Sequence, residues 1–389
     1  MKRTYKYRIY PNKEQQIKIN NTLHLCMILY NLALEQRISI YKNHKKSIYY
    51  NEQQNQLPEL KKTYNEFKEI HSQVLQNVLH RVDNAYHLFF LRLKAHKKGK
   101  DAGFPRFKSA DRYDSFTYPQ YKLRLEKNRI TLLKIGNIKI VYQRPIEGRV
   151  KTLTVKKEVD QYYVCITCEI SKEIPAKKVV ETAIGVDLGL NHFITLSNSE
   201  TVDNPKYLKQ SESKLVFQQK HLSRKKKGSK NRNKQKLKLA RIHRKIRNQR
   251  KDFLHKLSRK LVNKYDLIVF EDLKVQNMLQ NHHLAKSIAD ASWSKLVSNC
   301  VYKAEEAGKH CIKVNARDTT KECSKCHEKV HVPLWQRVYE CKNCGLVIDR
   351  DFNAAKNILN RAGSARINAC GDGEVSSSLK QDTRGFGCG

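Results

Sequence analysis

The chain has 389 residues, enough for more than one hydrophobic core, and it contains 77 Lys and Arg against 37 Asp and Glu. The formal net charge of +40 exceeds what solubility requires and indicates a polyanionic partner, with nucleic acid as the leading candidate. No apolar run approaches the roughly 20 residues of a membrane-spanning helix, and the opening residues lack the apolar core of a signal peptide. Eleven cysteines fit reduced thiols and metal ligands better than a secreted disulfide framework, so we expect a cytoplasmic protein without a membrane partner.

The N-terminal part of the sequence predicts one strand followed by helices. Apolar and charged residues alternate over residues 2–10, as they do in a half-buried strand. Asn12 followed by Gln15 is typical of a capping box, and the apolar-rich residues 17–41 then predict a long helix. Apolar residues at steps of three and four over 74–93 predict a second helix.

A region of different character follows these helices. Residues 104–178 consist of short alternating runs separated by Asn, Gly and Pro, which predicts an all-β unit. We expect the strand at residues 1–10 to pair into this unit, so that a helical module of residues 11–103 is inserted between the first strand and the others. The expected fold class is multidomain, with separate α, β and α/β parts.

The C-terminal half combines short apolar strands with a strongly basic segment. Residues 183–198 and 266–273 contain strands of the nearly all-apolar kind that is buried on both faces. Between them, residues 221–260 hold eighteen Lys or Arg and a single acid. One thin apolar seam predicts that the insertion 205–264 is helical, with basic residues on its remaining faces. Residues 363–389 are rich in Gly and Ser, which predicts a disordered tail.

Four cysteines form two Cys-x2-Cys pairs separated by 14 residues. This spacing is typical of a structural zinc ribbon, in which each pair occupies adjacent corners of a tetrahedron about 2.3 Å from Zn²⁺. His327 and His331 could replace a thiolate, but four cysteines already complete the shell, so we interpret both histidines as solvated. The predicted zinc ligands are Cys323, Cys326, Cys341 and Cys344.

Cys165 and Cys168 have the same spacing but a different sequence context. They lie in the run QYYVCITCEI, where strand alternation places residues three apart on opposite faces. No second pair stands near them in the sequence. We therefore interpret them as packing cysteines and assign them no metal.

Three acids lie within or beside the predicted core elements: Asp187, Glu271 and Asp351. Taken singly, Asp187 could pair with a structural arginine, Glu271 could be a surface acid, and Asp351 could be a helix N-cap. Together they predict a ligand set for Mg²⁺ or Mn²⁺, because these ions prefer oxygen, and two such ions can promote phosphodiester hydrolysis. Gly185 and Gly189 leave the backbone beside Asp187 bare, so we expect a polyanion to approach there.

Several motifs occur in an order that resembles the TnpB (OrfB) family of bacterial insertion sequences, relatives of type V CRISPR nucleases. They are YKYRIYPNKEQQ, GFPRFKSA, GVDLGL, VFED, the two Cys-x2-Cys pairs and CGLVIDRDFNAAKNIL. The resemblance implies an RNase H-like (RuvC) nuclease domain over residues 179–362, with the basic insertion and a zinc ribbon at 318–347. It also implies a β-barrel wedge domain of residues 1–10 and 104–178, which carries the inserted helical recognition module.

The family motifs also imply roles for individual residues. Asp187, Glu271 and Asp351 match the catalytic acids, and the family pattern rather than spacing favours Asp351 over its neighbour Asp349. One departure is His327, which stands after the first cysteine pair where the family commonly has glycine. This change leaves the four zinc ligands intact, although it affects the turn in which His327 lies.

The function implied by the resemblance is RNA-guided, divalent-metal-dependent cleavage of DNA. A guide RNA derived from the transposon would pair with double-stranded target DNA, and a single protein chain would bind the hybrid through charge and shape. The basic insertion is a candidate for tracking phosphates, with a solvated linker as the alternative. Its candidate residues are Arg224, Lys225, Lys226, Lys227, Arg244 and Arg247.

Two other functions remain open from the sequence. One is a DNA-binding transposition accessory protein that does not cut, although the presence of all three acids argues against a dead site. The other is a guide-independent nuclease acting on branched or hybrid substrates, which an RNase H-like fold alone would permit.

Overall fold

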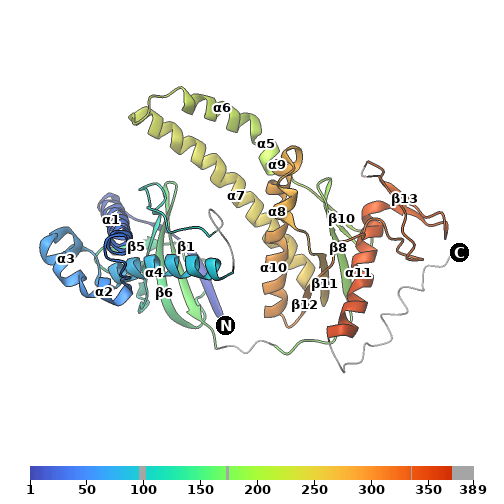
Figure 1. The fold of residues 1–389 in the computed structure, drawn as a ribbon, viewed down its shortest axis with the longest axis horizontal. Helices are drawn as coiled ribbons and strands as arrows, with labels where there is room; N and C mark the ends of the chain where they lie inside the picture. Colours follow the sequence, from blue (N-terminus) through green and yellow to red (C-terminus); the bar gives the residue numbers. More distant parts are fainter. Residues whose placement is uncertain (96–101, 172–174, 334, 370–389) are drawn as a thin grey trace. The chain divides into compact units, whose positions relative to one another are not determined.

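The computed structural model describes residues 1–95, 102–171, 175–333 and 335–369, and the described side chains end at residue 363. The chain divides into two compact units, Met1–Glu173 and Ile174–Gly389, which are described separately below (Figure 1). Within the described residues, no helix combines the length and the apolar composition that a bilayer crossing requires.

The first unit is built around one antiparallel sheet with the order β2-β6-β7-β1-β5-β4-β3. The N-terminal strand pairs with β7 along most of its length, from Lys2 opposite Glu169 to Ile9 opposite Tyr162, and its far end pairs with β5. The described pairings do not join the end strands β2 and β3, so closure into a barrel stays a prediction. The strands are β1 (Lys2–Tyr10), β2 (Ser115–Tyr118), β3 (Leu125–Glu126), β4 (Arg129–Leu132), β5 (Gly136–Ile140), β6 (Arg149–Glu158) and β7 (Gln161–Glu169).

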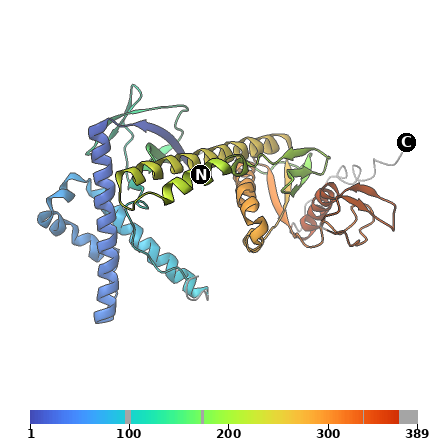
Figure 2. The ribbon, with the colours of Figure 1, turned by 90° about the horizontal axis from the view of Figure 1, so that it is seen from above.

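A set of helices lies between β1 and β2 in the sequence and shares one core with the sheet. The predicted capping box is confirmed, because Asn12 Oδ1 accepts the Gln15 N–H at 2.8 Å and Gln15 Oε1 accepts the Asn12 N–H at 3.0 Å. Figure 2 shows the long α1 with α4 leaving it at an angle. The elements are α1 (Lys13–His44), α2 (Tyr50–Asn55), α3 (Leu57–Thr63), the 3₁₀ helix η1 (Asn65–Glu69) and α4 (Ser72–Lys94).

The second unit contains a mixed sheet with the order β10-β9-β8-β11-β12. Strands β8, β11 and β12 are parallel, whereas β9 and β10 are antiparallel to their neighbours. Nearly every residue of β8 and β11 is buried, as expected for strands that helices cover on both faces. The strands are β8 (Ala183–Leu188), β9 (His192–Leu196), β10 (Thr201–Asp203), β11 (Leu267–Glu271) and β12 (His310–Val314).

Different helices cover the two faces of this sheet. On one face, Ile268 and Phe270 pack with residues of α7 and α10. On the other face, Leu267 and Val269 pack with Ile358 of α11. The helices are α5 (Tyr207–Gln210), α6 (Glu212–Ser223), α7 (Lys230–Lys264), α8 (Val275–Met278), α9 (His282–Ala291), α10 (Trp293–Glu306) and α11 (Arg350–Ala369).

The basic insertion is a helical hairpin rather than continuous helix. Helices α6 and α7 are joined by a turn in which Gly228 has a φ of 82°. The Arg232 side chain closes the turn, because it donates to the carbonyl oxygens of Leu222 at 2.7 Å and Lys225 at 2.8 Å. The segment is helical as predicted, and the Gly-Ser pair that ends the turn is a recognisable helix break and N-cap.

The predicted disordered tail begins too early. Helix α11 continues past Gly363 to Ala369, because the added residues include helix-forming Ala and Arg and an established helix extends at little cost. The rest of the predicted tail, residues 370–389, lies outside the described residues.

Candidate functional site

Two of the three predicted acids lie side by side on the central strands of the mixed sheet. Val186 of β8 pairs with Phe270 of the parallel strand β11, so the residues that follow them, Asp187 and Glu271, are also level with each other. Level residues on neighbouring parallel strands point to the same face, with Cα atoms about 4.8 Å apart. Both side chains are buried, with 8% of Asp187 and 7% of Glu271 exposed, so the reading of Glu271 as a surface acid is wrong.

Helix α11 brings the third acid to this face of the sheet. A Cβ added at Gly185 would lie 2.1 Å from the carbonyl oxygen of Ala355, so the helix backbone rests directly on β8 at this glycine. Asp187 lies two residues beyond Gly185 on the same face of β8, and Asp351 lies about one turn before Ala355 on α11. The charges of Asp187 and Asp351 interact, since Asp351 contributes to the raised pKa of Asp187.

This packing also corrects the reading of the two glycines. Gly185 admits a helix, not a polyanion, because the backbone of α11 fills the space above it. Gly189 is required by the turn between β8 and β9, where an added Cβ would lie 2.6 Å from the carbonyl oxygen of His192.

The N-cap of α11 is Asp349, so the reading of Asp351 as an N-cap is wrong. Asp349 Oδ1 accepts the backbone N–H groups of Asp351 at 2.9 Å and Phe352 at 3.0 Å. The Asp351 carboxylate instead lies 3.3 Å from Arg350 and 3.5 Å from Arg337. Because Asp349 takes the capping role, the Asp351 side chain can serve the acid cluster, by which we mean Asp187, Glu271 and Asp351.

The acid cluster is electrostatically strained. Burial raises the pKa of Asp187 well above its usual value, and the nearby Glu271 and Asp351 raise it further, whereas Arg350 opposes the rise. Burial also raises the pKa of Glu271, against the opposing effects of a Thr319 hydrogen bond and the charge of Arg361. Two buried carboxylates with a third, half-buried one nearby are stabilised by a cation among them, so these residues fit a divalent ion.

The carboxylates are spaced more widely than the cysteine ligands. Within the part of the chain that the structure describes, the cysteines are the one group whose potential ligand atoms all lie within 4.8 Å of one another. Asp351 forms ion pairs with Arg337 and Arg350, and Glu271 accepts a hydrogen bond from Thr319. The acid cluster is therefore a set of three converging side chains held by separate partners.

The four cysteines are gathered as a tetrahedral metal requires. The Sγ atoms of Cys323 and Cys344 are 3.6 Å apart, and those of Cys326 and Cys341 are 3.5 Å apart. A tetrahedral zinc ion with 2.3 Å bonds would separate its sulfurs by about 3.8 Å, so this cysteine cluster fits zinc. Backbone N–H donation from Glu328 lowers the pKa of Cys326 to about 6, whereas burial raises that of Cys323 to about 12.

The turns after the two cysteine pairs place His327 and Gly345 in equivalent positions. His327 has a φ of 63° and Gly345, after the second pair, has a φ of 70°, so each pair is followed by a left-handed residue. His327 adopts this conformation at a cost that glycine would avoid. Its exposed ring lies 3.1 Å from Glu322, and the exposed His331 also lies outside the cysteine cluster.

Cys165 and Cys168 are packing residues of β7. Burial alternates along the strand, so that Cys168 is buried in the core of the first unit and Cys165 is half-buried on the opposite face. Neither belongs to a group of potential metal ligands in the described residues.

The predicted phosphate-tracking residues divide between two parts of the α6–α7 hairpin. Arg224 and the exposed Lys225, Lys226 and Lys227 lie at the turn. Arg244 and Arg247 lie well inside α7. The structure therefore places them along one extended basic element and does not gather them into a pocket.

Sequence comparison gives this arrangement a family. Models described as "Probable transposase", "Cas12f1-like, TNB domain" and "Helix-turn-helix domain" match residues 155–282, 293–358 and 1–46. A Streptomyces pristinaespiralis protein named "Putative RNA-guided DNA endonuclease" is 35% identical over an alignment of 382 residues that covers 96% of this chain and 92% of that protein. The Escherichia coli K12 protein "Putative RNA-guided DNA endonuclease InsQ" is 32% identical over an alignment of 387 residues that covers 95% of this chain and 94% of the relative.

The chain therefore belongs to the TnpB (OrfB) family, as its motifs predict. Among solved structures, "Structure of the mini-RNA-guided endonuclease CRISPR-Cas_phi3" matches with a TM-score of 0.51 at 9% identity. The match covers 96% of this chain and 94% of the chain in that structure. This similarity is one of fold. Over residues 1–46, where the helix-turn-helix model matches, the structure has the strand β1 and the single helix α1.

Sequence reasoning missed the roles of two residues that shape the site, Gly185 and Thr319. Gly185 was recognised as a bare backbone position, but the helix that uses it is distant in the sequence. Thr319 is 2% exposed and donates a hydrogen bond to Glu271, and nothing in its local sequence distinguishes it from its exposed neighbour Thr320.

Proposed function

We propose that the chain is an RNA-guided, divalent-metal-dependent DNA endonuclease encoded by a transposable element. The observation that carries this proposal is the convergence of Asp187, Glu271 and Asp351 from two strands and a helix onto one face of the sheet. Burial raises the pKa values of Asp187 and Glu271, the nearby Asp351 adds to the effect at Asp187, and carboxylates buried without a cation cost stability. The names of the two relatives that span nearly the whole chain agree with it.

The site residues have distinct tasks in this chemistry. Divalent ions, when bound, activate water and stabilise the leaving oxygen of the cleaved phosphodiester. Asp187 and Glu271 provide oxygen ligands fixed by the paired strands β8 and β11, and Asp351 provides a ligand from the first turn of α11. The arginines beside Asp351 offer positive charge to a phosphate that enters the site.

We propose the following division of the chain. The mixed sheet with its two helical layers supports an RNase H-like (RuvC) nuclease domain over residues 179–362, with a zinc ribbon at 318–347. The antiparallel sheet of the first unit supports a wedge domain of residues 1–10 and 104–178, with the helices between them as a recognition module over residues 11–103.

The second metal and the nucleic acids follow from the remaining features. The sulfur spacing supports structural zinc at Cys323, Cys326, Cys341 and Cys344. The net charge of +40 supports simultaneous binding of a guide RNA and double-stranded target DNA by one chain. Arg224, Lys225, Lys226, Lys227, Arg244 and Arg247 are the proposed phosphate contacts.

A transposition accessory protein that binds DNA without cutting it is the alternative. Such a protein would need the basic hairpin but would have no use for buried, converging acids. The guide-independent nuclease would use the acids but would not need RNA. Both alternatives are therefore tested by the same assay.

The test is cleavage of a plasmid by purified protein. We expect the protein to carry transposon-derived RNA and to cut DNA that matches it only when both the RNA and Mg²⁺ are present. Cleavage that survives RNase treatment would favour the guide-independent nuclease. Specific RNA and DNA binding without cleavage under any metal condition would favour the accessory protein.

A further inference from the structure

One buried hydroxyl group is aimed at the acid cluster from outside it. Thr319 follows β12 and is only 2% exposed, and its Oγ1 donates a hydrogen bond to Glu271 Oε1. The same hydroxyl lies 3.2 Å from the carbonyl oxygen of Ala316. A hydroxyl has one proton, and a carboxylate accepts it more strongly than a neutral carbonyl, so an ionised Glu271 takes the bond.

The segment that carries Thr319 is fixed to helix α11 by a row of polar side chains. Asn353, Asn357 and Arg361 are spaced four residues apart, so they lie on one face of the helix. The buried Asn357 donates from Nδ2 to the carbonyl oxygens of Thr319 at 2.9 Å and Glu322 at 2.5 Å. Both acceptors belong to the loop that contains Thr319, so Asn357 holds this loop against α11.

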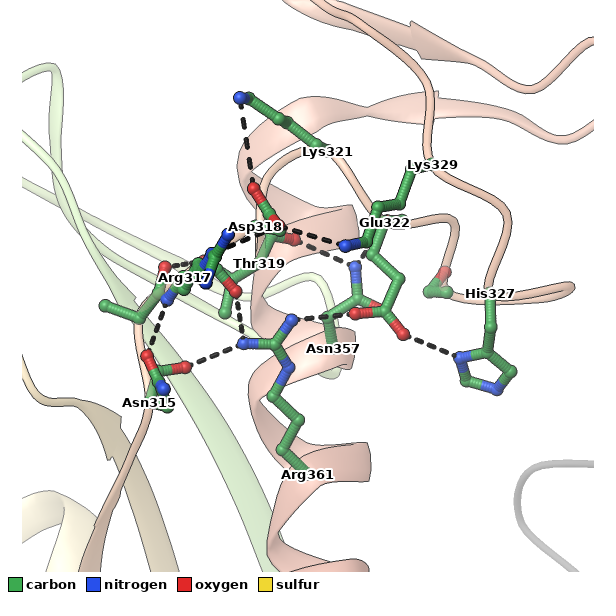
Figure 3. Close-up of polar contacts among 12 residues, drawn as sticks. Asn315, Arg317, Asp318, Thr319, Lys321, Glu322, His327, Lys329, Asn357 and Arg361 are labelled. Carbon is green, nitrogen blue, oxygen red and sulfur yellow. Dashed lines mark hydrogen bonds and ion pairs between the residues drawn. The ribbon is translucent and has the colours of Figure 1, made fainter.

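Arg361 holds the same loop at three points (Figure 3). Its Nη1 donates to the carbonyl oxygens of Asn315 at 2.7 Å and Arg317 at 2.6 Å, and its Nη2 lies 2.7 Å from Glu322 Oε2. The charge of Arg361 also reaches Glu271, whose pKa it lowers. The guanidinium therefore holds residues on both sides of Thr319 in the chain.

The row continues to the cysteine cluster. Asn353 is fully buried, donates from Nδ2 to the carbonyl oxygen of Glu322 at 2.8 Å, and accepts the N–H of Ser324 at 2.9 Å. These residues flank Cys323, the first cysteine of the cluster. One helix thus carries Asp351, the anchors of Thr319 and the anchor of the first cysteine pair.

We propose that Thr319 is a positioning residue for Glu271. Asn357 and Arg361 hold the loop that carries Thr319 in place, and the Thr319 hydroxyl orients the Glu271 carboxylate for divalent-metal binding. This inference rests on the proposed function and adds to it a residue outside the three acids. Groups that orient a metal-ligating carboxylate typically contribute about 10- to 100-fold in metal affinity or activity when they are removed.

The test measures Mn²⁺ binding to the RNA-free, zinc-loaded full chain by electron paramagnetic resonance. Thr319→Val removes the hydroxyl at nearly constant volume, Thr319→Ser keeps it, and Thr320→Val is the matched control at the exposed neighbour. We expect Thr319→Val to weaken Mn²⁺ binding by about tenfold or more, while Thr319→Ser and Thr320→Val stay within about threefold of wild type. Zinc content and melting temperature, measured in parallel, show whether each variant is folded.

A double-mutant cycle with Glu271→Gln separates positioning from general damage. If Thr319 acts through Glu271, Thr319→Val weakens Mn²⁺ binding in the wild type but adds almost nothing in the Glu271→Gln background. Equal losses in both backgrounds, or a Thr319→Ser variant as weak as Thr319→Val, would overturn the proposal. Should Thr319→Val not fold, Thr319→Ala replaces it in the cycle.

These outcomes are independent of the nuclease assay. A wild-type chain that binds Mn²⁺ but cuts no DNA would defeat the proposed function and leave the role of Thr319 testable by binding. If the wild-type chain cuts DNA and the Thr319→Val variant binds Mn²⁺ with unchanged affinity, only the positioning role is defeated.

Discussion

Replacing Gly185 with Ala tests how α11 delivers Asp351 to the sheet. The new Cβ would lie 2.1 Å from Ala355 O and 2.9 Å from Leu359 N, and both are backbone atoms that cannot rotate away. Restoring an ordinary contact requires the helix to move by about 1 Å. Overpacking of this kind lowers the free energy of unfolding by about 3 kcal/mol. Replacing a glycine within a strand offsets about 1 kcal/mol of this loss, because alanine loses less conformational entropy on folding.

We therefore expect Gly185→Ala to lower the stability of this unit by about 2 kcal/mol and its melting temperature by about 4–8 °C. A displacement of about 1 Å at Asp351 should also reduce guided cleavage by roughly 100-fold. The matched control is Gly363→Ala on the same helix, where an added Cβ meets nothing within 4 Å.

Calorimetry and cleavage rates measure both effects. Gly363→Ala should leave cleavage unchanged and raise stability by about 0.5–1 kcal/mol, because alanine is the better helix former. A Gly185→Ala protein as stable and as active as wild type would refute the close packing of α11 on β8.

Three further predictions concern metals, charge and pH. Cys326→Ser should reduce bound zinc below one ion per chain and lower the melting temperature, whereas Cys165→Ser should retain its zinc; mass spectrometry of the metal content decides. Exchanging Lys225, Lys226 and Lys227 for Ala should weaken RNA binding. It should also reduce the steepness of the plot of log binding constant against log salt concentration by about 3. An unchanged slope would mean that this turn contacts no phosphates. In magnesium-free buffer, stability should fall as pH rises from about 4 towards the raised pKa of Asp187, because the folded state holds that proton more tightly. Urea titrations at several pH values should show a smaller fall in Asp187→Asn protein, in which only the raised pKa of Glu271 still acts in this direction.

Features encoded by nearby residues could be predicted from the sequence. The Asn12–Gln15 capping box, the two long helices of the first unit and the buried strands around Asp187 and Glu271 all follow from local periodicity or cap chemistry. The cysteine cluster follows from ligand spacing, since each pair needs only one tight turn.

Features that depend on distant packing could not be predicted. The use of Gly185 depends on Ala355 of α11, and the burial of Thr319 depends on Asn357 and Arg361. Choosing Asp351 over Asp349 needed the family pattern, because only the hydrogen bonds of Asp349 show that it caps the helix. The basic insertion was predicted to be helical, but the pairing of α6 with α7 depends on contacts between distant residues, such as the hydrogen bond from Gln235 to Gln218.

Guided cleavage by Asp187→Ala protein is the most direct test of whether the acid cluster is a catalytic metal site. The substitution removes one metal ligand from β8 and leaves the basic hairpin and the cysteine cluster unchanged. We predict that the variant binds guide RNA and target DNA as wild type does, and that its cleavage in Mg²⁺ falls below detection. Cleavage at the wild-type rate by this variant would contradict the assignment of Asp187, Glu271 and Asp351 as the nuclease site.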